Sequence, residues 1–216
     1  MLKDVRQARQ ILRAVIDASD RPVTVKLRMG FDGDDRSDCL TIADDARAAG
    51  AAGVCVHART VEQRYTGRAD WDFLTEVKRR YPQWTVIASG DAATPTAAAE
   101  LMAVTGADGV AIARGAIGNP WFFRQLADHL AGREPRRPDL AEQRAVLEDH
   151  FDQTVAMYGP RRGPARMRKF GIKYARMHPT PAKVRAAFVN VKSPAGWRRA
   201  LDEFYPSGNK TPDGNT

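Results

Sequence analysis

The chain has 216 residues, of which 43% are hydrophobic and 28% are charged, an ordinary composition for a soluble globular protein. It has no apolar run as long as a membrane span, no apolar segment of the signal-peptide type at its start, and two cysteines with no disulfide or metal-binding spacing. These features exclude a membrane protein, and we expect a cytoplasmic protein without a metal site.

The formal net charge of +8 is concentrated at one end of the chain. From residue 151 onward there are 13 Lys or Arg and 4 Asp or Glu, whereas residues 1–150 are nearly neutral. A basic segment attached to a near-neutral one is typical of proteins that bind a polyanion, and RNA or DNA fits better than a membrane. The alternative is a helical surface that is basic only for solubility.

Helices and short strands alternate over the first half of the chain. Apolar residues at helical spacing predict a helix over residues 4–18. Short apolar runs bounded by turn residues predict four strands, at about residues 22–28, 53–57, 84–88 and 108–113. Helices are predicted between these strands, over residues 39–49, 71–81 and 96–104. This order predicts an α/β protein with a parallel sheet.

Two strand residues are candidates for a functional site. Lys26 lies within the first strand, where a buried ammonium is costly unless it meets an anion or a carbonyl. The alternative is a lysine that extends into solvent from the strand. His57 ends the second strand, and parallel α/β proteins place catalytic groups at that edge of the sheet. A purely structural histidine is the alternative there.

The stretch from Trp84 to Trp121 contains two glycine turns. Ser89-Gly90-Asp91 follows the third strand and Arg114-Gly115 follows the fourth. A right-handed parallel connection places both turns at the same edge of the sheet. Their backbone N–H groups and the charge of Arg114 indicate a phosphate site. Tight turns that need glycine for backbone reasons alone are the alternative.

After the fourth strand the pattern becomes helical. Helices are predicted over residues 120–130, 140–158, 165–177, 181–190 and 196–204. The pattern of strands and helices before them is that of the second half of a barrel or of a small open sheet. We predict that residues 1–132 form the second half of a TIM (β/α)₈ barrel, with four parallel strands. We predict a basic helical domain over residues 133–205 and a disordered tail over residues 206–216. A half-barrel of this kind would expose one face of its interior.

Five motifs, in order over about residues 10–125, resemble tRNA-dihydrouridine synthases. They are Pro22-Val23-Thr24-Val25-Lys26-Leu27-Arg28, His57-Ala58-Arg59-Thr60 with Gln63 and Tyr65-x-Gly67-x-Ala69-Asp70-Trp71, Ser89-Gly90-Asp91, Asp108-Gly109-Val110-Ala111-Ile112-Ala113-Arg114-Gly115 and Gly118-Asn119-Pro120-Trp121. The resemblance implies a barrel in which NADPH reduces FMN, and the flavin hydride reduces C6 of a tRNA uridine. The basic helices resemble the family's RNA-binding domain in place and character.

The resemblance also implies roles for individual residues. The implied FMN-binding residues are Lys26 at the polar edge of the flavin ring, His57 beside the ring, and Ser89, Gly90, Asp91, Ala113 and Arg114 on the phosphate side. The candidate contacts to the RNA substrate are Arg28, Arg59, Arg166, Arg168 and Lys169. Ser89 and Ala113 stand where the family usually has Asn and Gly, which shortens one hydrogen-bonding side chain and adds one methyl group.

The family's catalytic cysteine follows an Asn-x-Gly-Cys-Pro motif that this sequence does not contain, so we assign no catalytic residue. Cys39 and Cys55 stand in other contexts. We expect an FMN-dependent oxidoreductase that is truncated, lacks the N-terminal half-barrel and is a monomer when completed. Because general acid catalysis contributes about 10²–10⁴-fold, we expect little activity from the chain alone. The alternatives are an inactive RNA-binding remnant and another FMN- or phosphate-binding barrel.

Overall fold

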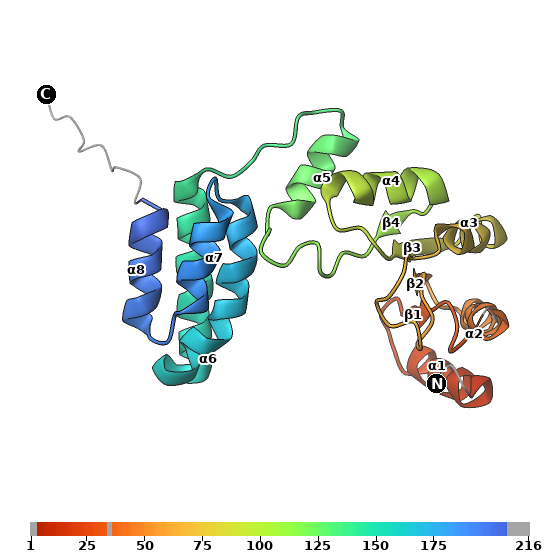
Figure 1. Cartoon of the computed structure of the whole chain (residues 1–216). Helices are drawn as coiled ribbons and strands as arrows, with labels where there is room; N and C mark the ends of the chain where they lie inside the picture. The colour runs from red at the N-terminus through yellow and green to blue at the C-terminus, as the bar shows by residue number, and fades with distance from the viewer. Residues whose placement is uncertain (1–3, 34–35, 207–216) are drawn as a thin grey trace, which may run out of the picture. The chain divides into compact units, whose positions relative to one another are not determined.

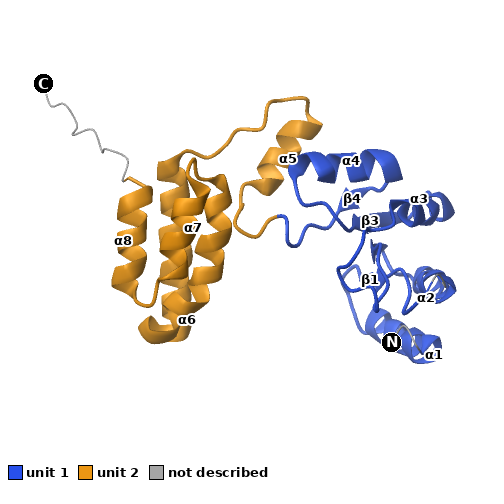
Figure 2. Ribbon diagram, in the orientation of Figure 1, with its two compact units in different colours: residues 1–115 blue, residues 116–216 orange. Residues whose placement is uncertain are grey.

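The computed structural model describes residues 4–33 and 36–206. The tail predicted over residues 206–216 lies outside the described ranges, except for Pro206. The chain divides into two compact units, residues 1–115 and residues 116–216 (Figure 2). Within the described ranges, no helix is both long and apolar enough to cross a membrane.

The first unit is a parallel sheet with helices on one side of it (Figure 1). Its strands are β1 (Thr24–Arg28), β2 (Gly53–His57), β3 (Thr85–Ser89) and β4 (Gly109–Val110), in the spatial order β1-β2-β3-β4. Its helices are α1 (Val5–Asp17), α2 (Ser37–Ala48), α3 (Trp71–Arg80) and α4 (Pro95–Thr105). The predicted parallel α/β arrangement is therefore confirmed, and its strand order agrees with part of a barrel.

Local sequence signals set the ends of the helices. The Asp70 carboxylate accepts a hydrogen bond from the Phe73 N–H and caps α3, while the Thr94 hydroxyl accepts one from Ala97 and caps α4. Pro95 occupies the first turn of α4, where its missing N–H costs nothing. The helix ends at Gly106, whose φ of 68° is left-handed. The helix predicted over residues 96–104 is therefore confirmed, and it extends one residue further at each end.

The two faces of the sheet differ in burial. Val54, Val56, Val86 and Ala88 point toward the helices and are buried. Lys26 is exposed, and its register neighbour Cys55 is only partly buried. Residues in register on parallel strands point to the same face, so Lys26 and Cys55 share the open face. The predicted exposure of the interior face is confirmed, although this face carries a charge and a thiol as well as apolar groups.

The fourth strand is shorter than predicted. We expected residues 108–113, whereas β4 spans Gly109–Val110. Ala111 still donates to the carbonyl of Ala88, and the chain then leaves the sheet. Among the described strands, β4 pairs with β3 alone, so no ladder on its other side extends it.

The second unit is helical. It contains α5 (Phe122–Leu130), α6 (Leu140–Tyr174), the 3₁₀ helix η1 (Ala175–Met177), α7 (Pro181–Val189) and α8 (Pro194–Phe204). We grouped residues 116–132 with the barrel, but they belong to this compact unit, where Trp121 packs against the helical core. Trp197 lies at the centre of that core, with ring centroids 4.8 Å from Phe151 and 4.7 Å from Phe188.

The element α6 is a helical hairpin with two arms. Gly159 interrupts it with a φ of 77° and a ψ of 163°, which are not helical values. Beyond this turn the chain returns along the first arm, because the rings of His150 and Phe170 lie 4.8 Å apart. A Cβ at Gly163 would lie 2.9 Å from the Val155 side chain. The separate helices predicted over residues 140–158 and 165–177 correspond to these arms, which lie side by side in Figure 1.

Candidate functional site

The carboxyl ends of three strands bring the predicted site residues together. Arg28 lies opposite His57 in the register of β1 and β2, and His57 lies opposite Ser89 in that of β2 and β3. Lys26 stands two residues before Arg28 and therefore on the same face. This face is the open one, so the three strands present two cations, an imidazole and a hydroxyl to the same space.

The positive charge at this edge acts on His57. Burial lowers the pKa of His57, and the nearby cations lower it further, to about 4. The cations concerned are Arg28, Lys26, Arg59 and Arg114. The imidazole is therefore neutral near pH 7. Cations gathered around a partly buried, neutral histidine are suited to an anionic ligand.

Tyr65, in the loop after β2, connects two of these cations. Its ring centroid lies 4.4 Å from Cζ of Arg114 and 5.7 Å from Cζ of Arg28. Arg28 also donates hydrogen bonds to the carbonyls of Thr60 (2.7 Å) and Arg64 (3.1 Å) in the same loop. Sequence reasoning did not assign Tyr65 to the site. The sequence signal that could have identified it is an aromatic residue in an otherwise polar loop.

Arg59 corrects one of our predictions. We expected it to contact RNA, but its side chain is 2% exposed. Its Nη2 donates to both carboxylate oxygens of Asp91, at 2.6 and 2.8 Å, and to the carbonyl of Gly67 at 2.7 Å. Asp91 also accepts from the Ala69 N–H at 2.7 Å. Arg59 therefore holds the turn after β3 to the loop after β2, and it is too deeply buried to bind RNA directly.

The turn after β3 needs glycine for its own geometry. Gly90 has a φ of 135° and Asp91 a φ of 57°. A Cβ at Gly90 would lie 2.6 Å from Cβ of Ala69, which is closer than real side chains approach. Trp71 donates from its indole nitrogen to the Gly90 carbonyl at 3.2 Å. These constraints account for the glycine without a ligand, so phosphate binding by this turn stays a prediction.

The last two predicted cofactor residues lie after β4. Ala113 and Arg114 are both exposed, and Arg114 is the residue that stacks on Tyr65. The structure thus brings Arg114 to the loop after β2, on the same side of the sheet edge as Arg28. The contact of Ala113 and Arg114 with FMN stays a prediction.

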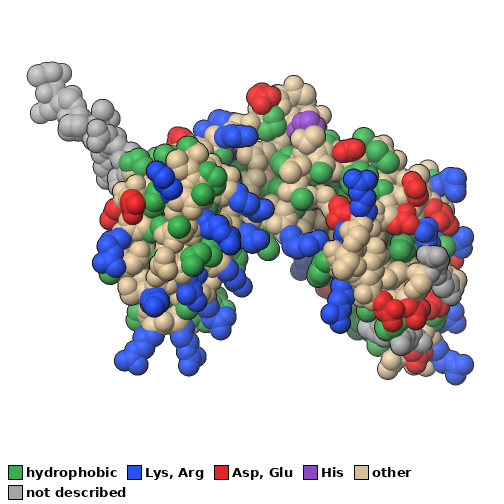
Figure 3. All heavy atoms as spheres, viewed as in Figure 1, with side chains coloured by type: hydrophobic (Ala, Val, Ile, Leu, Met, Phe, Trp, Pro, Cys, Tyr) green, Lys and Arg blue, Asp and Glu red, His purple; other side chains and the backbone are tan. Residues whose placement is uncertain are grey.

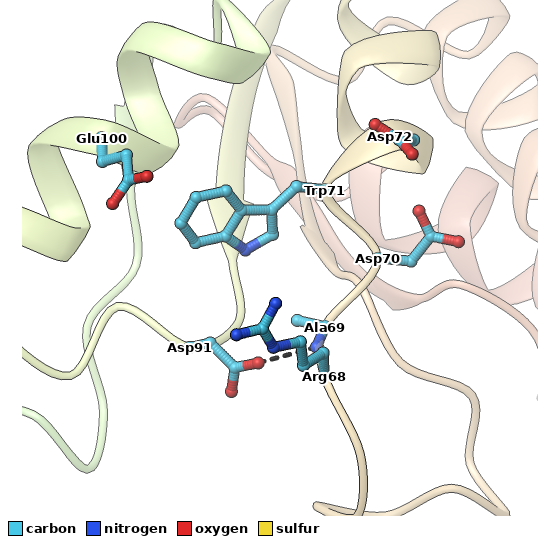
Figure 4. Close-up of a pocket in the computed structure, with 7 residues that line it drawn as sticks. All are labelled: Arg68, Ala69, Asp70, Trp71, Asp72, Asp91 and Glu100. Atoms are coloured by element: carbon cyan, nitrogen blue, oxygen red, sulfur yellow. Dashed lines mark hydrogen bonds between the residues drawn. The ribbon is translucent and has the colours of Figure 1, made fainter.

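A cavity of about 600 Å³ lies beside this edge, at the start of α3 and next to the middle of α4 (Figure 4). Its lining consists of Arg68, Ala69, Asp70, Trp71, Asp72, Asp91 and Glu100. Four of these seven residues are acids, and two of the acids are paired with arginines, Asp70 with Arg36 and Asp91 with Arg59.

Comparison with known proteins identifies the family. The model of the dihydrouridine synthase family matches residues 1–207. The chain belongs to this family. It is 36% identical over 212 residues to a probable tRNA-dihydrouridine synthase of Rickettsia conorii, covering 98% of this chain and 63% of the relative. It is 38% identical to tRNA-dihydrouridine synthase B of Xanthomonas axonopodis pv. citri, covering 90% of this chain and 58% of the relative.

A probable tRNA-dihydrouridine synthase of Mycobacterium leprae is 38% identical to this chain, over 85% of this chain and 49% of the relative. The resemblance seen in the five motifs is therefore confirmed for the chain as a whole. The chain spans between about half and two thirds of the length of these dihydrouridine synthases.

Neither cysteine of this dihydrouridine synthase family member lies at the carboxyl edge of the sheet. Cys39 is 1% exposed within α2, and burial raises the pKa of its thiol to about 12. Cys55 is at the middle of β2, where partial burial also raises the thiol pKa. A thiol with a raised pKa is a weak proton donor, so the structure gives neither cysteine the position or the acidity of a general acid.

The second unit carries the predicted RNA contacts on one arm of α6. Arg166 and Lys169 are exposed and Arg168 is partly exposed. Between residues 153 and 201 the sequence contains 12 Lys or Arg and no Asp or Glu. No ion pair of the described residues involves a cation of that segment. Figure 3 shows Lys and Arg side chains gathered over these helices.

Proposed function

We propose that this chain is the flavin-binding and RNA-binding part of a tRNA-dihydrouridine synthase. The reaction would reduce uridine in tRNA to dihydrouridine, with FMN as the cofactor and NADPH as the reductant. The observation that carries this proposal is the group of cations around a neutral His57 on the open face of the sheet. Family membership supplies the chemistry, and the geometry supplies a place for an anionic aromatic cofactor.

The residues on the open face suit FMN. Lys26 has three donors for the polar edge of the isoalloxazine ring, and Arg114 has a planar guanidinium for the phosphate. Asp91, the acid of the adjoining turn, is neutralised by Arg59 and does not oppose a bound phosphate. Ser89 contributes a hydroxyl in register with His57. Bound FMN would supply hydride transfer to C6 of the uracil ring.

The roles of the chain's own groups follow from these positions. Lys26 would hold the flavin ring by its polar edge, and the neutral imidazole of His57 would lie beside it as a hydrogen-bonding group. Arg28, fixed by two loop carbonyls, would be positioned to meet the substrate. The proton for C5 of the uracil would come from a group other than Cys39 or Cys55. We further propose that the enzyme works in the cytoplasm as a monomer.

The basic helices favour one alternative, an RNA-binding protein without catalysis. Twelve cations that form no ion pair with the described acids would attract RNA whether or not flavin is bound. A second alternative, a different FMN- or phosphate-binding barrel, would keep the open-face site but would not need the basic helices. Flavin binding and tRNA binding must therefore be measured separately.

The decisive experiment is a titration of the purified chain with FMN, in which binding is measured by visible absorption and flavin fluorescence. We expect the chain to bind FMN, and Lys26→Ala to weaken binding about 10- to 150-fold, the range for a lost hydrogen bond to a charged group. Lys192→Ala, at an exposed lysine of the helical unit, is the matched control. A folded chain that binds tRNA but no FMN would support the RNA-binding alternative. Binding of FMN without any affinity for tRNA would support a different flavin barrel.

A further inference from the structure

The turn of the α6 hairpin presents an aromatic ring to solvent. Tyr158 precedes the turn at Gly159 and is 40% exposed, and its neighbour Met157 is 73% exposed. Cζ of Arg166, on the returning arm, lies 4.1 Å from the centroid of the Tyr158 ring. A guanidinium at this distance is a cation–π contact. It holds the ring in place while part of the ring stays accessible.

The surroundings of this ring are strongly basic. Arg161 and Arg162 are exposed just after the turn, and Lys169 is exposed further along the same arm. The nearest acids in the sequence are Asp152 before the turn and Asp202 far beyond it. Exposed cations that no acid neutralises, next to an exposed aromatic ring, are the combination that single-stranded nucleic acid recognises.

We propose that Tyr158 stacks on an unpaired base of RNA, with Arg166 supporting the ring from its other side. Arg161 and Arg162 contact phosphates next to that base. This inference rests on the proposed function, because it takes tRNA as the partner of the helical unit. It adds a residue outside the predicted RNA contacts and specifies what that residue binds.

The chemistry favours an unpaired base over other ligands of a basic surface. In an RNA duplex the bases are stacked on one another, and a tyrosine ring has no free base to contact. Bases in loops are unstacked and have free π-faces. An anionic membrane would also attract Arg161 and Arg162. It would need an apolar surface to insert, and Arg166 covers part of this ring.

The test compares tRNA affinities of the full chain by fluorescence anisotropy over a range of salt concentrations. Tyr158→Ala should weaken binding about 5- to 150-fold, the range for one lost base stack, without changing the dependence on salt. Tyr158→Phe should keep the affinity because it keeps the ring. Arg161→Ala with Arg162→Ala should instead reduce the salt slope by about 0.7–0.9 for each lost phosphate contact. Phe123→Ala, at an exposed ring of α5, is the control and should bind as the unchanged chain does.

The outcomes separate this inference from the function on which it rests. If the unchanged chain has no affinity for tRNA, both fail. If it binds tRNA and Tyr158→Ala binds equally well, only the stacking inference is overturned. Competition by duplex RNA as strong as that by oligo(U) would also overturn it. The inference would also be overturned if Tyr158→Ala lost binding to phosphatidylserine vesicles but kept its affinity for tRNA. Circular dichroism of each variant ensures that affinities are compared between folded chains.

Discussion

Nη2 of Arg59 lies 2.6 and 2.8 Å from the two carboxylate oxygens of Asp91, 32 residues further along the chain. This contact joins the loop after β2 to the turn after β3. These two segments border the cations Lys26, Arg28 and Arg114, which we call the cation cluster. Asp91 stands beside the predicted phosphate site, and Arg59 compensates the negative charge of its carboxylate. The contact thus shapes the site and removes a repulsion from it.

Removing the acid of this pair should destabilise the first unit. Asp91→Ala would leave the buried Arg59 guanidinium without its charged partner, at a cost of about 2–4 kcal/mol in the free energy of unfolding. Because the Asp91 side chain is 33% exposed, water offsets part of the full penalty. Urea denaturation measures the change. Asp17→Ala, which breaks the exposed pair with Arg13, should change stability by less than about 1 kcal/mol.

The same pair predicts an acid dependence of stability. Burial opposes the ionisation of Asp91, but hydrogen bonds from Ala69 and Arg59 outweigh it and hold the pKa of Asp91 below its usual 3.8. A depressed carboxyl pKa contributes stability above the unfolded-state pKa, and this stability is lost as the pH falls through the folded-state value. Below pH 3.8, Asp91→Asn should therefore lose less stability than the unchanged chain. Equal acid dependence of the two proteins would contradict the prediction.

His57 should titrate well below the ordinary histidine pKa of 6.5. Its pKa is lowered from 6.5 to about 4, so it stays neutral in the folded chain while the unfolded chain takes up a proton at about 6.5. This difference destabilises the folded chain progressively as the pH falls from 6.5 to 4, and has no effect above that window. NMR titration of the His57 ring measures the value. Lys26→Ala and Arg28→Ala should each raise the pKa, and inorganic phosphate bound at the cluster should raise it too.

Gly118 should tolerate no side chain. Its φ is 80°, and a Cβ would lie 2.5 Å from the carbonyl carbon of Lys173 in α6. Gly118→Ala should cost about 1–2 kcal/mol for the left-handed backbone and about 1–3 kcal/mol more for the clash. Gly132→Ala is a matched control, since Gly132 has a φ of 69° but a Cβ there would meet no atom within 4 Å. Urea denaturation of both variants should separate the two costs, and equal losses would refute the close packing.

The sequence by itself determined the elements and their order. Short apolar runs predicted four strands within a few residues, because a strand between helices needs little more than apolar residues and bounding turns. The helices predicted over residues 71–81 and 96–104 begin within one residue of α3 and α4, since their caps, Asp70 and Thr94, act on neighbouring residues only. Lys26 lies within the first strand and His57 at the end of the second, as predicted, but Lys26 is exposed on the open face and is not buried.

Tertiary structure alone decided what each side chain contacts. Arg59 was predicted to meet RNA, but the fold brings Asp91 to it, and no local pattern encodes a contact between residues so far apart in sequence. The sequence assigned neither Tyr65 nor Tyr158 a contact, and their rings meet arginines only because the fold brings separate segments together. The length of β4 likewise depends on the strand beside it, because a ladder is made by two strands.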